Sequence, residues 1–174
     1  MQNAIAFGER YVQAAQIQNA KVTALPRPPT PFNWMVIVET PEVYHYTLVS
    51  LSRTEAPLPL GADASFFTRV AAPYMPLPRA LWVEAPRWGR ERDSAFAREA
   101  MGQLQFEFFR WFSRYPVLLR TSVDNSGTCA WFQDLRFLTP GRASWPFRYG
   151  MCRGASGEWR PYELLSDNSK TPVY

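Results

Sequence analysis

Residues 31–51 have the sequence PFNWMVIVETPEVYHYTLVSL, and this stretch decides the fold. Residues 34–38 are a dense run of large and β-branched side chains, and residues 43–51 mix apolar and aromatic ones, as the faces of a sheet require. Residues 40–42 separate the two runs, because the proline among them fixes φ and has no N–H to donate to a strand ladder. The stretch therefore predicts two strands joined by a tight turn.

The composition is that of a chain that folds as one domain, residues 1–174. It is 47% hydrophobic and 16% aromatic, and a chain of this length buries roughly 70% of its extended-chain surface. Sixteen prolines cluster mainly in residues 26–31, 57–59 and 73–86, which predicts long irregular connections. No window holds the roughly 18 to 20 uninterrupted apolar residues of a membrane helix, so we expect this domain itself to be soluble.

Arginine supplies almost all of the positive charge. Of 19 basic residues only Lys21 and Lys170 are lysine, and the net charge is +4. Guanidinium groups pair with carboxylates and stack on aromatic rings more readily than ammonium groups do. Because this chain is rich in rings, we expect many arginines to be used within the fold, and we do not expect nucleic acid as a partner.

The first third of the chain predicts a helix and then an extended connector. Apolar Ile5, Tyr11 and Val12 share one face of a helical pattern in residues 1–20. Residues 21–32 are expected to be a proline-rich connector, because residues before proline avoid the helical region. The alternative, that this segment is a PxxP peptide recognised by a signalling domain, is much less favoured than a stiff connector.

Residues 53–92 are the least regular part of the pattern. Short apolar runs at 65–72 and 80–83 lie among prolines and predict one or two short strands. The segment has too many large apolar groups for a free linker, so we expect it to lie on the core or to cover a sheet edge. A partner-binding surface is the alternative, and residues 66–88 also suit the contact of a homodimer.

Residues 94–114 predict one long amphipathic helix, because apolar side chains recur three and four residues apart and Asp93 or Ser94 can act as N-cap. Tyr115-Pro116 ends it. Turn sequences at 124–127, 139–142 and 154–157 then separate strand candidates in an antiparallel meander, which lie at 117–123, 128–138, 145–152 and 158–165.

These elements predict an α+β fold. An antiparallel sheet of five to seven strands packs on the long helix, and the N-terminal helix docks at an edge. The core is expected in residues 33–165. The polar tail, residues 166–174, is expected to fray.

The two cysteines permit one specific inference. If the strands at 128–138 and 145–152 form a hairpin with Phe137 opposite Ser144, Cys129 lies directly opposite Cys152. Facing Cβ atoms in a sheet lie within the range of a disulfide. A slip of one residue would destroy the pairing, and the redox state depends on the compartment.

No catalytic or metal-binding motif is recognisable. His45 is the single histidine, and a metal site or a Cys–His pair needs more than this, so we interpret it as structural. Asp134 and Arg136 lie two residues apart on one side of a strand and favour a structural ion pair over a ligand-binding arginine. Phosphate-binding glycine loops and nucleophile elbows are absent. We therefore expect no cofactor and no metal, and enzymatic activity stays an open question.

Several segments resemble the soluble C-terminal domain of bacterial membrane-bound metal-dependent hydrolases. The resemblance lies in a proline-rich lead into PFNW (residues 31–34), in DLRF (134–137) and in PFRY (146–149), and it covers residues 20–150 discontinuously. In that family the metal-binding histidines belong to a multi-helix membrane region that has no counterpart in this sequence. The resemblance implies an extramembrane domain that is membrane-associated through a missing N-terminal region, with Met1 as an engineered start.

Two functions follow as expectations. The first is a non-catalytic accessory domain of a membrane-bound hydrolase-like protein, whose partner is its own membrane-embedded region or another protein. The alternative is a free-standing small-molecule binding protein or enzyme, with an aromatic pocket between sheet and helix and arginines at its mouth. The candidate ligand-binding residues are Trp131, Arg136, Arg148 and Tyr149.

Overall fold

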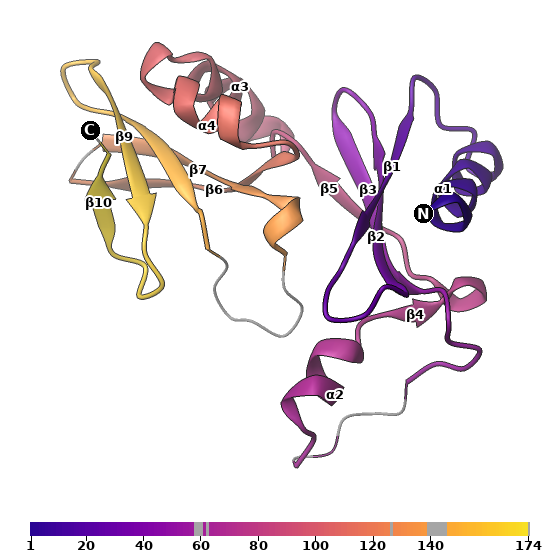
Figure 1. Cartoon of the computed structure of the whole chain (residues 1–174). Helices are drawn as coiled ribbons and strands as arrows, with labels where there is room; N and C mark the ends of the chain where they lie inside the picture. The colour runs from indigo at the N-terminus through magenta and orange to yellow at the C-terminus, as the bar shows by residue number, and fades with distance from the viewer. Residues whose placement is uncertain (58–60, 62, 126, 139–145, 174) are drawn as a thin grey trace. The chain divides into compact units, whose positions relative to one another are not determined.

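The computed structural model of the chain describes residues 1–57, 61, 63–125, 127–138 and 146–173. It divides into two compact units, Met1–Ala85 and Pro86–Tyr174, where the sequence predicts a single domain. Each unit contains helices and a five-stranded sheet, and antiparallel pairing dominates both sheets, so the fold is α+β as predicted (Figure 1).

The first unit is built on the predicted hairpin. Its strands are β2 (Asn33–Glu39) and β3 (Val43–Ser50), paired antiparallel from Asn33 opposite Ser50 to Glu39 opposite Tyr44. Thr40 closes the turn, because its hydroxyl accepts a hydrogen bond from the Val43 N–H at 3.0 Å and donates to the Val43 carbonyl at 2.7 Å. Both faces of β2 are buried, which accounts for its continuous apolar run.

The expected connector contains a strand. Residues 21–32 were predicted to be extended without pairing, but β1 (Lys21–Pro26) pairs antiparallel with β2. Val22, Thr23 and Leu25 favour a strand, and the missing N–H of Pro26 is tolerated at the end of an edge strand.

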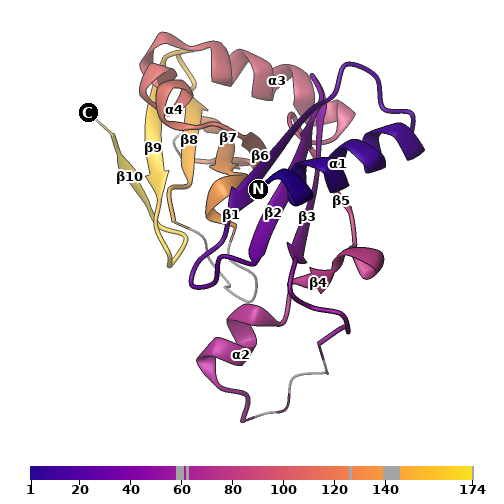
Figure 2. The ribbon, with the colours of Figure 1, turned by 45° about the vertical axis from the view of Figure 1, so that its right-hand side comes forward.

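Helix α1 (Gln2–Ala14) covers this sheet next to β1 and β2, as Figures 1 and 2 both show. It is shorter than the predicted range of residues 1–20. Gly8 permits its close approach, since a Cβ there would lie 2.5 Å from a Val22 methyl group and 2.8 Å from a Val36 methyl group.

The proline-rich segment of the first unit contains a helix as well as short strands. The run at 65–72 was expected to be a strand, but it forms helix α2 (Phe66–Ala71), because the Ser65 hydroxyl caps the Thr68 N–H at 3.2 Å. Strand β4 (Met75–Pro76) pairs parallel with β3, the 3₁₀ turn η1 (Leu77–Arg79) follows, and β5 (Val83–Pro86) pairs with β3.

The second unit is the predicted meander with one additional strand. The sheet order is β10-β9-β8-β7-β6, and every neighbouring pair is antiparallel. The strands are β6 (Pro116–Asp124), β7 (Gly127–Asp134), β8 (Tyr149–Arg153), β9 (Trp159–Leu164) and β10 (Lys170–Pro172). The prediction of a fraying tail is wrong for residues 170–172, which pair with β9. The predicted turn at 139–142, and Ser144 and Trp145, lie outside the described residues.

The predicted long helix is two helices. Helix α3 (Glu91–Gly102) ends where Gln103 adopts an extended conformation, the 3₁₀ turn η2 (Leu104–Phe106) follows, and α4 (Glu107–Phe112) completes the segment. Arg110 bridges the break, because its Nη1 donates to the carbonyls of Met101 at 2.6 Å and Gln103 at 2.7 Å. The carbonyls freed at the end of α3 thus gain a cationic donor.

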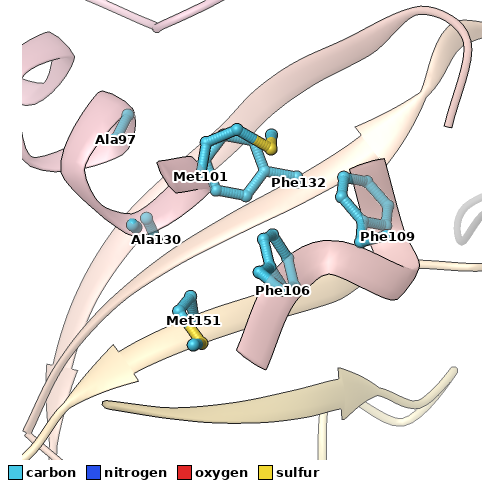
Figure 3. Packing of buried hydrophobic residues seen from close by; sticks show 8 residues of the cluster. Ala97, Met101, Phe106, Phe109, Ala130, Phe132 and Met151 are labelled. Atoms are coloured by element: carbon cyan, nitrogen blue, oxygen red, sulfur yellow. The ribbon is translucent and has the colours of Figure 1, made fainter. Parts of the chain in front are cut away.

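One face of the second sheet packs on these helices and is called the helix face. Its core consists of fully or almost fully buried side chains from α3, η2, α4 and the strands β7 and β8. Figure 3 shows Met101, Phe106, Phe109 and Phe132 gathered between helices and sheet. The last part of the expected strand 128–138 is instead the 3₁₀ turn η3 (Leu135–Phe137), capped by the Asp134 side chain. The members of the core are Ala97, Ala100, Met101, Phe106, Phe109, Ala130, Phe132 and Met151.

The described helices are all too short or too polar to cross a membrane. This finding applies to the described part of the chain.

Candidate functional site

The opposite face of the second sheet carries the candidate site and is called the disulfide face. Side chains alternate along each strand, so the residues next to those of the helix face point here. Facing pairs place them together: Arg120 opposite Trp131, Cys129 opposite Cys152, and Gly150 opposite Tyr162. A small apolar cluster forms on this face from Cys129, Trp131, Cys152 and Leu164, with Tyr162 against it.

Cys129 and Cys152 are joined by a disulfide with an S–S distance of 1.98 Å. The strand register is the one that the sequence predicts, with the two residues directly opposite each other in β7 and β8. The premise about Phe137 was wrong, since Phe137 lies in η3 and not in the strand. The observed register runs from Thr128 opposite Arg153 to Phe132 opposite Tyr149.

Thiol titration tests this bond. Protein taken fresh from its native compartment and denatured without reductant should show no reactive thiol, because the described chain has no free cysteine. After reduction, two thiols per chain should react. Two reactive thiols before reduction would show that the pair is not oxidised in that compartment.

Trp131 is the largest buried side chain of the disulfide face. Its indole lies against Gly150, where a Cβ would be 2.3 Å from the ring, and its Nε1–H donates to the Ser122 hydroxyl at 2.8 Å. The residue is almost completely buried. Glycine at position 150 therefore provides the space that the ring occupies.

Replacing Gly150 with alanine should destabilise the second unit by about 1–3 kcal/mol, because the new methyl group overlaps the Trp131 ring in a packed cluster. The matched control is Gly102→Ala, since a Cβ at Gly102 meets no atom within 4 Å among the described residues. Urea unfolding of both variants, followed by tryptophan fluorescence, gives the comparison. Equal unfolding free energies for the two variants would contradict this packing.

A cavity of about 470 Å³ opens beside Trp131. This volume lies in the range of small-molecule sites, roughly 300–1,000 Å³. The residues that line it come from β6, β7, β9, β10 and the turn before β10: Arg120, Ser122, Val123, Asp124, Asn125, Trp131, Leu164, Asn168, Ser169 and Lys170. A second cavity of about 350 Å³ shares Asn125 with it and includes Cys152, Glu158, Arg160 and Tyr162.

Arg148 lies behind the cavity wall and is only 6% exposed. Its Nη1 donates to Asn168 Oδ1 at 3.2 Å and its Nη2 donates to the Leu165 carbonyl, whereas its buried Nε has no hydrogen-bond partner within the described chain. Burial, and secondly the charge of Arg120, lower the pKa of Arg148. A buried cation with neutral acceptors thus adds positive potential to this part of the sheet.

The charges in the cavity wall are mainly positive. The Arg120 side chain is exposed, and its guanidinium makes no hydrogen bond or ion pair with any residue that the structure describes. The Lys170 ammonium contacts Asp124 at 2.5 Å. Asp167 lies in the turn between β9 and β10. Its carboxylate accepts hydrogen bonds from the hydroxyl and the N–H of Ser169, and these bonds lower the pKa of Asp167.

The structure separates the four predicted ligand-binding residues. Trp131 lines the cavity and Arg148 supports it through Asn168. Tyr149 belongs to the helix face, where the centroid of its ring lies 5.2 Å from that of Phe108 and 5.8 Å from that of Phe109. Burial, and secondly Glu163, raise the pKa of Tyr149. The pocket was expected between sheet and helix, but aromatic side chains of η2 and α4 pack in that space.

Arg136 has a structural position, as its ion-pair interpretation predicts. Its Nε and Nη2 each lie 2.8 Å from Asp134 Oδ2, and Nη2 also donates to the Phe112 carbonyl at 2.6 Å. The guanidinium lies over the rings of Phe112 and Phe137. These contacts fix α4 and η3 to the end of β7.

His45 belongs to the first unit and also joins structural elements. The Tyr11 hydroxyl of α1 lies 3.2 Å from His45 Nδ1, and the Glu84 carboxylate of β5 lies 3.7 Å from the same atom. The Tyr11 ring stacks on Trp82 with centroids 3.8 Å apart. Among the described residues, no three histidine, cysteine or acidic side chains gather as a metal site would require.

Sequence reasoning missed Arg120, Ser122, Asn168 and Lys170. The turn at Asp124–Gly127 was the available signal, because a tight hairpin there places Arg120 opposite Trp131. No family model, curated protein or solved structure matches this chain.

Proposed function

We propose that the chain is a non-catalytic binding domain and that its second unit takes up a small ligand in the 470 Å³ cavity of the disulfide face. The observation that carries the proposal is the cavity itself, with the buried Trp131 at its base and, around it, polar groups from β6, β10 and the turns next to these two strands. Ligand sites combine these features: mostly preformed walls, apolar surface and a few fixed polar groups.

The rigidity of the cavity supports the proposal. The disulfide fixes β7 to β8, the Trp131 N–H is held by Ser122, and Arg148 ties β8 to the segment after β9 through Leu165 and Asn168. A preorganised site loses less conformational entropy on binding than a mobile one. Among the described residues that line the cavity there is no activated nucleophile or acid–base pair of the kind that would indicate a reaction.

Fluorine NMR of the full chain labelled with fluorotryptophan tests this function. The Trp131 resonance is assigned from the variant Trp131→Phe, and small-molecule fragments are then added in mixtures. Binding in the cavity should shift the Trp131 resonance in a saturable way and leave that of Trp34, in the first unit, unchanged. Fragments that bind while the Trp131 resonance stays constant would refute the cavity as the site.

We propose in addition that this binding domain is the extramembrane accessory part of a membrane-bound hydrolase-like protein. The proposal rests on the resemblance described above. It is supported by the structural use of two of the motif regions: the Trp34 Nε1–H donates to the Pro31 carbonyl at 3.0 Å, and Asp134 binds Arg136. Residues devoted to the fold suit an accessory domain. Reading the genomic frame upstream of Met1 tests it, and the absence of membrane-spanning codons there would refute it.

A further inference from the structure

We propose that the cavity of the disulfide face binds a small organic anion, a carboxylate or phosphate monoester with an apolar group, and that Arg120 and Lys170 hold its charge. This inference rests on the proposed function, because it names the class of ligand for the same cavity. It is argued from the charges, the hydrogen-bond donors and the apolar wall of the site.

The first argument is the surplus of positive charge. Arg120 and Lys170 line the cavity, and Arg148 lies directly behind it. Within the described chain, the acidic groups near them are Asp124, which contacts Lys170, and Asp167, which is bonded to Ser169. Three cations thus stand against two carboxylates, and the guanidinium without an ion pair, that of Arg120, is in the wall.

The second argument is the buried guanidinium of Arg148. A cation that is removed from water and bonded only to neutral acceptors is unfavourable unless a negative charge approaches it. The two groups that accept hydrogen bonds from the Arg148 guanidinium, the Leu165 carbonyl and the Asn168 side chain, are neutral. An anion in the adjoining cavity would offset this cost, and it would reduce the repulsion between Arg148 and Arg120 that contributes to the lowered pKa of Arg148.

The third argument is that hydrogen-bond donors predominate in the wall. The Asn168 oxygen is taken by Arg148, so its amide N–H groups are left to donate. The Ser122 oxygen accepts from Trp131, so its own O–H is left to donate. Together with the guanidinium and the ammonium group, these donors suit a ligand group that only accepts, which a carboxylate or phosphate does.

The fourth argument is the apolar part of the wall. Val123, Trp131 and Leu164 line the same cavity. An inorganic anion would leave this surface uncovered, whereas an organic anion can cover it and gain from burial of apolar area. The volume of about 470 Å³ accommodates such a molecule.

The experiment compares four probes on the full chain: phenyl phosphate, benzoate, the neutral benzamide, and inorganic phosphate. Affinity is measured by isothermal titration or by the Trp131 fluorine resonance. Phenyl phosphate and benzoate should bind on the order of tenfold more tightly than benzamide, because charge-assisted hydrogen bonds form only with the anions. Inorganic phosphate should bind more weakly than phenyl phosphate, since it leaves the apolar wall uncovered.

The variant Arg120→Gln should weaken phenyl phosphate binding roughly tenfold. Arg120 is exposed, so this variant should fold. The matched control is Arg92→Gln, because Arg92 is an exposed arginine of α3, on the helix side of the sheet. The Arg92→Gln variant should bind phenyl phosphate as tightly as the unaltered chain does. Added sodium chloride should weaken the binding of both anions and leave that of benzamide unchanged.

The outcomes separate the two proposals. If benzamide binds as tightly as the anions and Arg120→Gln has no effect, the anion inference is wrong and the cavity remains the ligand site. If none of the four probes shifts the Trp131 resonance, both proposals fail. If phenyl phosphate binds with the Trp131 resonance unchanged, or as well to Arg120→Gln as to Arg92→Gln, the anion is bound elsewhere and the inference is overturned.

Discussion

Replacing Phe106 with alanine should lower the free energy of unfolding of the second unit by about 3–5 kcal/mol, the range for large-to-small changes at buried aromatic residues. Phe106 is fully buried, and the centroid of its ring lies 4.8 Å from that of Phe109 and 5.8 Å from that of Phe132 (Figure 3). The loss combines the transfer of the ring out of the core with the cavity that remains, since close-packed neighbours relax only partly.

The matched control lies in the same 3₁₀ turn. Leu104 is 75% exposed, so Leu104→Ala should change the unfolding free energy by no more than about 0.5 kcal/mol. Urea unfolding followed by circular dichroism and by tryptophan fluorescence measures both variants. A loss below about 1 kcal/mol for Phe106→Ala would mean that η2 does not pack on the sheet as described.

Replacing Asp134 with alanine should also cost about 3–5 kcal/mol, because it removes one partner of a buried ion pair and leaves several donors without an acceptor. The carboxylate accepts hydrogen bonds from the Arg114 N–H at 2.7 Å and from the Arg136 N–H at 2.8 Å, in addition to the guanidinium. Its side chain is fully buried, whereas that of Arg136 is one-third exposed. Water can therefore reach part of the orphaned guanidinium, while the two backbone N–H donors lose the acceptor that the buried carboxylate supplied.

The comparison is the exposed ion pair between Glu99 and Arg153, whose nearest atoms are 3.2 Å apart. Glu99→Ala should cost less than about 1 kcal/mol, because solvent screens a surface pair. Asp134→Asn should fall between the two, since the amide keeps one oxygen as acceptor but loses the charge. If Asp134→Ala and Glu99→Ala have the same urea midpoint, the buried network does not contribute as described.

The strands were predictable where side-chain pattern and turn chemistry agree. The hairpin of β2 and β3 has dense β-formers on both sides of Pro41, and the meander has glycine-containing turns. The register that sets Cys129 opposite Cys152 followed from the same pattern. In these segments the local preferences and the tertiary structure favour the same conformation.

The errors arise where the local pattern is ambiguous. Apolar spacing continues through Gly102, so residues 94–114 resemble one helix although the chain turns at Gln103 to bury Phe106 and Phe109. Strand β1 was hidden by the prolines that follow it. Strand β10 has a polar sequence, and only its pairing with β9 makes it a strand. Tertiary contacts decide all three cases, and a single sequence does not contain them explicitly.

The candidate site was only half predictable for the same reason. Trp131 and Arg148 were identified by residue type, but the face on which each lies depends on the register. Arg120 and Lys170 are 50 positions apart and belong to the two edge strands, β6 and β10, so no local motif connects them. Sequence periodicity finds the core of a sheet more readily than it finds the walls of a cavity.

The alternation along β7 has a consequence for natural variation and for saturation mutagenesis. Ala130 and Phe132 face the core under the helices, and Cys129 and Trp131 belong to the disulfide face, where Trp131 also lines the cavity. If the cavity binds a ligand as we propose, selection should filter substitutions at even-numbered positions of β7 by whether the chain folds, and substitutions at Trp131 also by which ligand is accepted. Ligand preference can then diverge at this position of the strand while the fold is conserved.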